Sequence, residues 1–103
     1  MNDPKNQRRN PRIDLNQEIV FRTSETITGW GIDLGAGGIG AQLPVELAVG
    51  TKLEVEIFPG HASAYGEVRW CKPRDGGFRV GIQFSSEDWS IIEVVQTLRS
   101  QEG

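Results

Sequence analysis

The sequence predicts an all-β fold, namely a six-stranded antiparallel barrel with one C-terminal α-helix. Glycine is abundant, with 13 residues among 103, and the hydrophobic fraction is 37%. This mixture suits a turn-rich β domain, because glycine is costly inside helices and useful at turns and bulges. Six short segments alternate apolar and polar residues, whereas the last apolar segment repeats every three or four residues. Six antiparallel strands on so short a chain close most economically into a barrel, with the helix over an opening or an exposed face.

Residues that favour turns separate the six predicted strands. The pair Pro59-Gly60 ends the fourth strand, and residues 72–77 turn the chain between the fifth and the sixth. On the fifth strand Val68 and Trp70 share one parity, which predicts that both lie on its apolar face. The strands are predicted at residues 17–23, 26–33, 38–43, 51–58, 62–71 and 78–84.

The predicted helix begins at about residue 86. Ser85 or Ser86 can cap it, and Glu87 and Asp88 place acids in the first turn, where the free N–H groups favour negative charge. Its apolar residues recur at helical spacing and form one stripe. The stripe consists of Ile91, Val94, Val95 and Leu98.

The segment 33–40 places four glycines behind one carboxylate, Asp33. Glycine allows positive φ and close approach of the backbone to a flat ligand, so this composition is typical of a binding loop. Residues 35–40 also satisfy the dinucleotide pattern G-x-G-x-x-G, but that pattern requires a helix to begin at the third glycine. The chain instead runs into Pro44 within a few residues. A dinucleotide fold is therefore excluded.

Residues 1–12 form a basic arm on an acidic body. The arm has a side-chain charge of +3 while the whole chain has −3, which leaves −6 for the rest. It contains two prolines and no hydrophobic residue after Met1, so we expect it to be flexible, followed by a single domain over 13–103. The asymmetry favours a local anion site over a nucleic-acid or membrane surface, since those need basic charge spread along a face. The alternative is a solvated tail.

The remaining chemistry-bearing residues exclude several classes of protein. Cys71 and His61 are each alone, which excludes a disulfide framework and a cysteine-based zinc site and leaves no expected metal. No nucleophile–base pair or matched carboxylates indicate an enzyme. No apolar run predicts a membrane span or a signal peptide. We expect a cytoplasmic, non-catalytic protein without membrane insertion.

Four motifs occur in an order that resembles the PilZ domain family over essentially the whole chain. Residues 8–12 read R-x-x-x-R just before the first predicted strand, and residues 33–38 read D-x-x-x-x-G just after the second. Residues 66–70 (G-E-V-R-W) and 78–84 (F-R-V-G-I-Q-F) form the closing hairpin. Each motif alone is weak, but their order and separation are specific.

The resemblance implies a six-stranded barrel that acts as a receptor for the bacterial second messenger cyclic di-GMP and signals to a protein partner. In that family the outer arginines of R-x-x-x-R clasp the nucleotide, and the D-x-S-x-x-G loop reads a guanine edge. The tryptophan at the end of the fifth strand could pack on the ligand or in the core. The implied ligand-binding residues are Arg8, Arg9 as a helper, Arg12, Asp33, Gly35, Gly38 and Trp70.

The chemistry of the ligand agrees with these residue types. An arginine fork bonds phosphate or the guanine N7/O6 edge bidentately and also stacks on a base. A carboxylate complements the guanine N1–H and N2–H donors. A flexible arm that becomes ordered over the barrel on binding would change the surface offered to a partner, at an entropy cost.

Gly35 stands where the family motif has serine. Loss of one neutral hydrogen bond costs roughly 0.5–1.5 kcal/mol, which weakens binding about two- to tenfold. The departure leaves open a second interpretation, a PilZ-like adaptor in pilus or motility control that binds only proteins. A third, a barrel for single-stranded nucleic acid, needs a basic groove with exposed aromatics, and the acidic body argues against it. Trp30 and Trp89 are expected to be packing residues.

Overall fold

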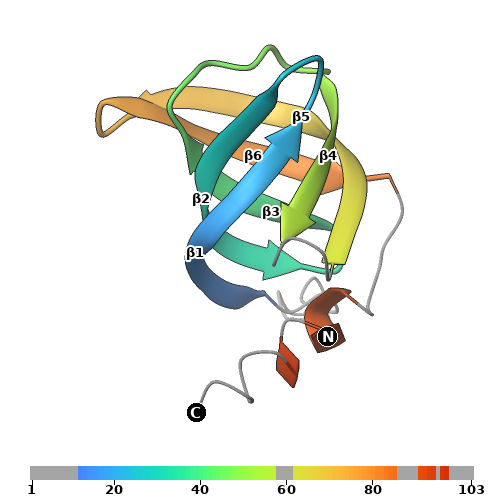
Figure 1. The fold of residues 1–103 in the computed structure, drawn as a ribbon. Coiled ribbons are helices and arrows are strands. Elements are labelled where there is room, and N and C mark those ends of the chain that lie inside the picture. The colour runs from blue at the N-terminus through green and yellow to red at the C-terminus, as the bar shows by residue number, and fades with distance from the viewer. Residues whose placement is uncertain (1–11, 58–61, 86–90, 95, 98–103) are drawn as a thin grey trace, which may run out of the picture.

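A computed structural model of the chain describes residues 12–57, 62–85, 91–94 and 96–97. Its strands form a closed antiparallel barrel in the order β1-β2-β3-β6-β5-β4, with β4 paired back onto β1 (Figure 1). The predicted six-stranded barrel is therefore confirmed. The strands are β1 (Ile13–Arg22), β2 (Thr26–Gly35), β3 (Gly38–Leu43), β4 (Lys52–Ile57), β5 (Ala62–Arg74) and β6 (Gly77–Phe84).

The core is built from inward-facing residues of all six strands. In β6, for example, Val80, Ile82 and Phe84 are buried while Gln83 between them is exposed, as the alternation predicted. No polar or charged side chain of the described residues is buried in this core. The fully buried side chains of largest volume are Phe21, Leu15, Ile19, Leu34, Ile39, Leu43, Ile57, Val55, Val68 and Val80.

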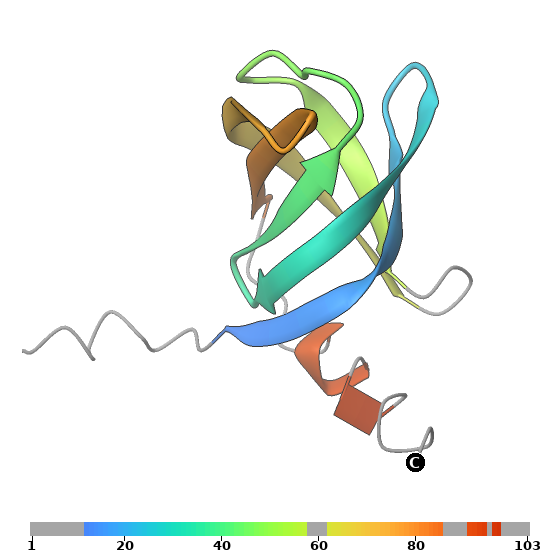
Figure 2. The same cartoon turned by 90° about the vertical axis from the view of Figure 1, so that its left-hand side faces the viewer.

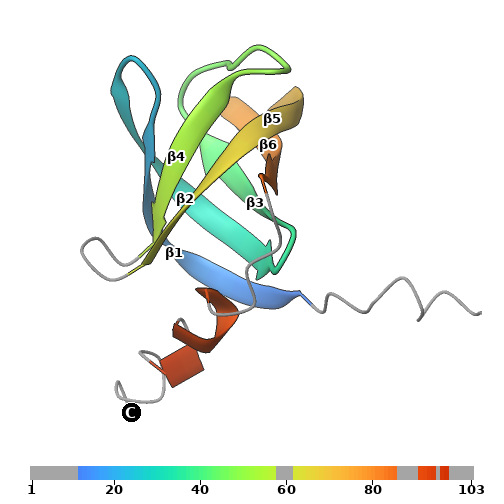
Figure 3. The same ribbon diagram turned by 90° about the vertical axis from the view of Figure 1, so that its right-hand side faces the viewer.

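A short helix near the C-terminus covers one end of the barrel, as predicted. Residues 91–94 and 96–97 are helical and lie beside the first part of β1 (Figures 2 and 3). Ile91 and Ile92 are buried in the barrel core, so the apolar face includes one residue more than the predicted stripe. The predicted start near residue 86, and Val95 and Leu98 of the stripe, lie outside the described residues. No helix in the described part of the chain is long and apolar enough to cross a membrane.

Four strands are longer than predicted, and the largest extensions, three residues each in β1 and β5, have a physical reason. β1 begins at Ile13 rather than residue 17, and its register shifts between Asp14 and Gln17, where Asn16 has a φ of 51°. Asp and Asn are depleted in strands, so this stretch looks like a turn in the sequence. β5 continues through Pro73, which is tolerated because β4 pairs only with residues up to Glu67, leaving that edge without a partner strand.

The predicted six-residue turn between β5 and β6 contracts to two residues. Asp75 and Gly76 have φ values of 53° and 79°, and Arg74 pairs with Gly77 on either side of them. Positive φ at both central positions is the geometry of a type I′ hairpin turn, for which Asp-Gly is a favoured sequence. The turn therefore fixes the register of β5 against β6.

Candidate functional site

A groove of about 420 Å³ lies on the outer face of the barrel, across strands β2, β3, β6 and β5. It extends from Arg12, directly before β1, to Arg69 and Trp70 of β5. Its lining residues are Arg12, Ile32, Asp33, Gly37, Gly38, Ile39, Gly40, Arg69, Trp70, Arg79, Gly81, Ile82 and Gln83.

The floor of the groove is backbone, because two glycines lie between Asp33 and Trp70. Cross-strand pairing places Asp33 beside Gly40, Gly40 beside Gly81, and Gly81 beside Trp70. A Cβ at Gly40 would lie 2.9 Å from Oδ1 of Asp33, and a Cβ at Gly81 would overlap the Trp70 indole. The two side chains therefore lie over glycines, where any larger residue would displace them, and they leave a flat strip between them.

The glycine-rich segment is a tight hairpin rather than an open loop. Gly35 pairs with Gly38 across a turn of two residues. Contrary to expectation, none of its glycines has a positive φ, since within the described chain positive φ among glycines occurs at Gly50 and Gly76. A Cβ at Gly38 would clash with the carbonyl oxygen of Ile82, so this glycine allows β3 to approach β6. These glycines permit close packing and a flat surface.

One wall of the groove carries an ion pair between Arg12 and Asp33. Nη2 of Arg12 donates to Oδ1 of Asp33 at 2.5 Å, although the residues are 21 apart in the sequence. The side chains are 46% and 40% exposed. Ion pairs this exposed contribute about 0–1 kcal/mol, so both groups can exchange partners at low cost.

The opposite wall is formed by a bulge in β5. The register of β5 against β6 shifts between Val68 and Trp70, so Val68 is fully buried while Trp70 is 41% exposed. The prediction that the two residues share the apolar face was wrong, because the extra residue of a bulge interrupts the alternation. The turned indole lies over Gly81, and Nζ of Lys72 is 5.6 Å from its ring centroid.

Sequence reasoning missed three polar residues of this wall, Arg69, Arg79 and Gln83. Arg79 and Gln83 flank Gly81 at two-residue spacing on the outer face of β6, opposite its buried residues. That alternation was visible in the sequence, but alternation does not distinguish a polar side chain that lines a groove from one that is only solvated. Arg69 is exposed as the alternation along β5 requires, and the bulge places the exposed Trp70 directly beside it; the sequence has no clear signal for this bulge.

The structure brings together four of the seven predicted ligand residues. Arg12, Asp33, Gly38 and Trp70 all line the groove. Gly35 is buried in the hairpin and does not line it. Arg8 and Arg9 lie outside the described residues. Trp30, expected to be a packing residue, is 48% exposed on another part of the surface, and Trp89 lies outside the described residues.

The charge of the groove is opposite to that of the body. Its lining contains three arginines and one carboxylate, a side-chain charge of +2, whereas the whole chain has −3. An anion with flat, donor-bearing rings matches a site with guanidinium groups, one carboxylate and an indole.

A larger cavity, of about 720 Å³, adjoins the groove and shares Arg69 and Gln83 with it. None of the predicted ligand residues lines this cavity. Charges at its rim are partly compensated, since Lys52 pairs with Glu67 at 3.4 Å. We therefore take the smaller groove as the candidate site.

Comparison with known proteins gives the same family as the sequence motifs. A model of the PilZ domain family matches residues 6–98. A search of curated protein sequences returned no match.

Three solved structures share the fold. The Bacillus subtilis inhibitor of motility MotI (DgrA) has a TM-score of 0.67 at 18% identity, over 90% of this chain and 50% of that one. Escherichia coli YcgR in complex with c-di-GMP has a TM-score of 0.64 at 20% identity, over 93% and 47%. The PilZ domain of YcgR with c-di-GMP has a TM-score of 0.61 at 21% identity, over 93% and 97%.

This chain thus spans about half the length of MotI and of whole YcgR, and nearly all of the isolated YcgR domain. At these identities the structural likeness shows the fold. The family model, which covers most of the sequence, shows more: the chain belongs to the PilZ domain family.

Proposed function

We propose that this protein is a non-catalytic receptor that binds cyclic di-GMP in the groove and signals to a protein partner. The observation that carries the proposal is the convergence of Arg12, Asp33, Gly38 and Trp70, which come from separate parts of the sequence, on one basic groove. The structure of YcgR, a relative with the same fold, contains c-di-GMP. We propose that the ligand here is the same.

The groove offers complementary groups for each part of the nucleotide. Arg12 suits a phosphate or the N7/O6 edge of guanine, and Asp33 suits the N1–H and N2–H donors of the same base. The exposed indole of Trp70 offers a flat face for stacking. The backbone floor at Gly38 and Gly40 lets a ring system approach closely. Arg8 and Arg9 would complete the clasp from the N-terminal arm.

Binding by this arrangement would exchange partners at the Arg12–Asp33 ion pair. Without ligand, the guanidinium of Arg12 and the carboxylate of Asp33 pair with each other. With ligand bound, the guanidinium would bond an acceptor of the ligand and the carboxylate would bond a donor. The arm that carries Arg12 would then be held against the barrel. We propose that this change of surface is the signal that a protein partner reads, for instance in the control of motility.

Calorimetric titration of the purified protein with cyclic di-GMP, with GTP as control, tests the proposal. Saturable binding in the micromolar range or tighter, absent with GTP, is the expected result. Absence of heat, together with unchanged NMR chemical shifts at protein concentrations near millimolar, would contradict it.

A second candidate function is an adaptor that binds only proteins. Gly35 favours it, because the motif serine that would supply a ligand hydrogen bond is absent. The same titration separates the two functions, since an adaptor of this kind does not bind the nucleotide.

A further inference from the structure

The groove contains a half-buried arginine, Arg79, that the family motifs discussed above do not assign to the ligand. We propose that Arg79 binds an anionic or N7/O6 group of the ligand and that Gln42, outside the groove, is a positioning residue that orients it. The inference rests on the proposed function, since it concerns the same ligand in the same groove.

Gln42 and Arg79 face each other across the β3–β6 ladder. Nε of Arg79 donates to Oε1 of Gln42 at 3.1 Å. This bond uses the donor nearest the chain and leaves the two terminal nitrogens of the guanidinium, with their four N–H groups, for other acceptors. The guanidinium of Arg79 is therefore held in place through Nε, while its terminal nitrogens can donate hydrogen bonds to a ligand.

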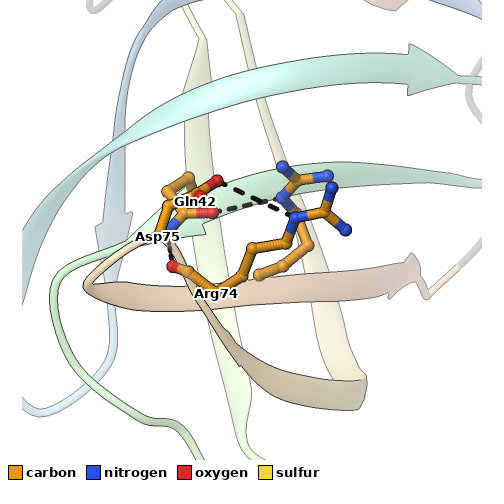
Figure 4. A network of polar contacts seen from close by, with 4 residues as sticks. Gln42, Arg74 and Asp75 are labelled. Carbon is orange, nitrogen blue, oxygen red and sulfur yellow. Dashed lines mark hydrogen bonds and ion pairs between the residues drawn. The ribbon is translucent and has the colours of Figure 1, made fainter.

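The orientation of Gln42 is itself fixed. Its Nε2 donates to the backbone carbonyl of Arg74 at 2.6 Å (Figure 4). Arg79 can only donate and the carbonyl can only accept, so the amide has one orientation that satisfies both. Arg74 directly precedes the Asp75-Gly76 turn, whose backbone is fixed by two positive φ values. The rigid turn thus fixes the orientation of the Gln42 amide. This amide in turn fixes the orientation of the Arg79 guanidinium.

The charge of Arg79 is not neutralised by this contact, because an amide carries no charge. Among the described residues, no ion pair involves Arg79, whereas Arg12 is paired with Asp33. A half-buried and already bonded side chain loses little conformational freedom when a ligand binds. Arg79 is therefore a preorganised cation facing a site that we propose for a dianion.

The alternative role of Gln42 is only to stabilise the β5–β6 turn through its bond to the carbonyl of Arg74. A double-mutant cycle distinguishes the two roles. The measured quantity is the Kd for cyclic di-GMP by calorimetry in the full chain. We expect Arg79→Ala to weaken binding about ten- to hundredfold, since a hydrogen bond to a charged group is lost. We expect Gln42→Leu to weaken it about three- to tenfold in the wild-type background and to have no further effect when Arg79 is already alanine.

Arg74→Ala is the matched control. It removes the same charge near the same turn, but its side chain pairs with Asp75 and does not line the groove, and its carbonyl remains for Gln42. We expect its Kd to change less than about twofold at physiological salt, where exposed charges are screened. Thermal unfolding checks that each variant is folded. Should Arg79→Ala not fold, Arg79→Lys replaces it, with an expected loss of about three- to tenfold because lysine lacks the planar fork.

The outcomes separate this inference from the proposed function. Wild-type Kd in a folded Arg79 variant overturns the role of Arg79 and leaves the receptor function standing. An equal loss from Gln42→Leu in both backgrounds overturns the positioning role. Absence of binding by the wild-type protein overturns both proposals.

Discussion

The two walls of the groove hold their charged groups in opposite ways. On the β1–β2 side, Arg12 and Asp33 are exposed and neutralise each other. On the β5–β6 side, Arg79 is half-buried against a neutral amide, and Trp70 lies over a glycine. The charged groups of the first wall must give up their mutual ion pair before they can bind a ligand. On the second wall, Arg79 has no partner of opposite charge among the described residues. The difference suggests that the first wall responds to the ligand and that the second supplies a fixed shape.

The largest effect is expected from Arg12→Ala, on the responsive wall. The variant loses a charge-assisted contact and leaves Asp33 without its partner beside a dianion, so binding should weaken about a hundredfold. Arg8→Ala should act similarly if the arm completes the clasp. Calorimetry gives the Kd, and Lys52→Ala, an exposed cation outside the groove, is the control. A Kd within twofold of wild type for Arg12→Ala would remove this wall from the site.

On the fixed wall, Trp70→Ala should weaken binding about tenfold, because stacking of a base on an aromatic side chain is worth roughly 1–3 kcal/mol. Trp30 provides the matched control, since it is also an exposed tryptophan but lines a different groove. Trp30→Ala should leave the Kd unchanged. Equal losses in the two variants would indicate a general effect of tryptophan removal rather than stacking in the groove.

A smaller effect should follow from Gly81→Ala, which changes the fixed wall without removing any of its groups. The new Cβ would overlap the indole of Trp70 and displace it, so we expect a loss of about three- to tenfold, close to that of removing the ring. In the Trp70→Ala background the same substitution should add almost nothing, because the clashing ring is gone. Additive losses in the Kd measurements would show that Gly81 acts on the ligand or on the sheet directly.

The barrel could be predicted from the sequence because its signal is local. Alternation within each strand, and turn pairs such as Asp75-Gly76, depend on neighbouring residues. The four motif positions in the groove could be named because they occur in an ordered pattern. The pairing of Arg12 with Asp33 and of Arg79 with Gln42 could not, since these contacts join residues 21 and 37 apart.

The outward position of Trp70 could not be decided from the sequence, for a different reason. A bulge adds one residue to one strand and reverses the faces that follow, and many residue types can occupy it. Parity counted from Val68 therefore puts the indole on the apolar face, whereas the family resemblance left open whether it packs on the ligand or in the core. The register of β5 against β6, which only the folded pairing defines, decides where this side chain lies.

The smallest predicted effect concerns Gly35→Ser, which restores the family motif. Residues 33 and 35 of β2 are two apart, so a side chain at position 35 would project from the same face of the strand as Asp33. A hydroxyl there could add one neutral hydrogen bond to the ligand, and we expect binding about two- to tenfold tighter, with unchanged thermal stability. Gly35→Ala separates the hydroxyl from the reduced backbone freedom that any side chain brings. Equal tightening in both variants would assign the gain to the backbone of the hairpin, and weaker binding in both would show that the hairpin has no room for a side chain at this position.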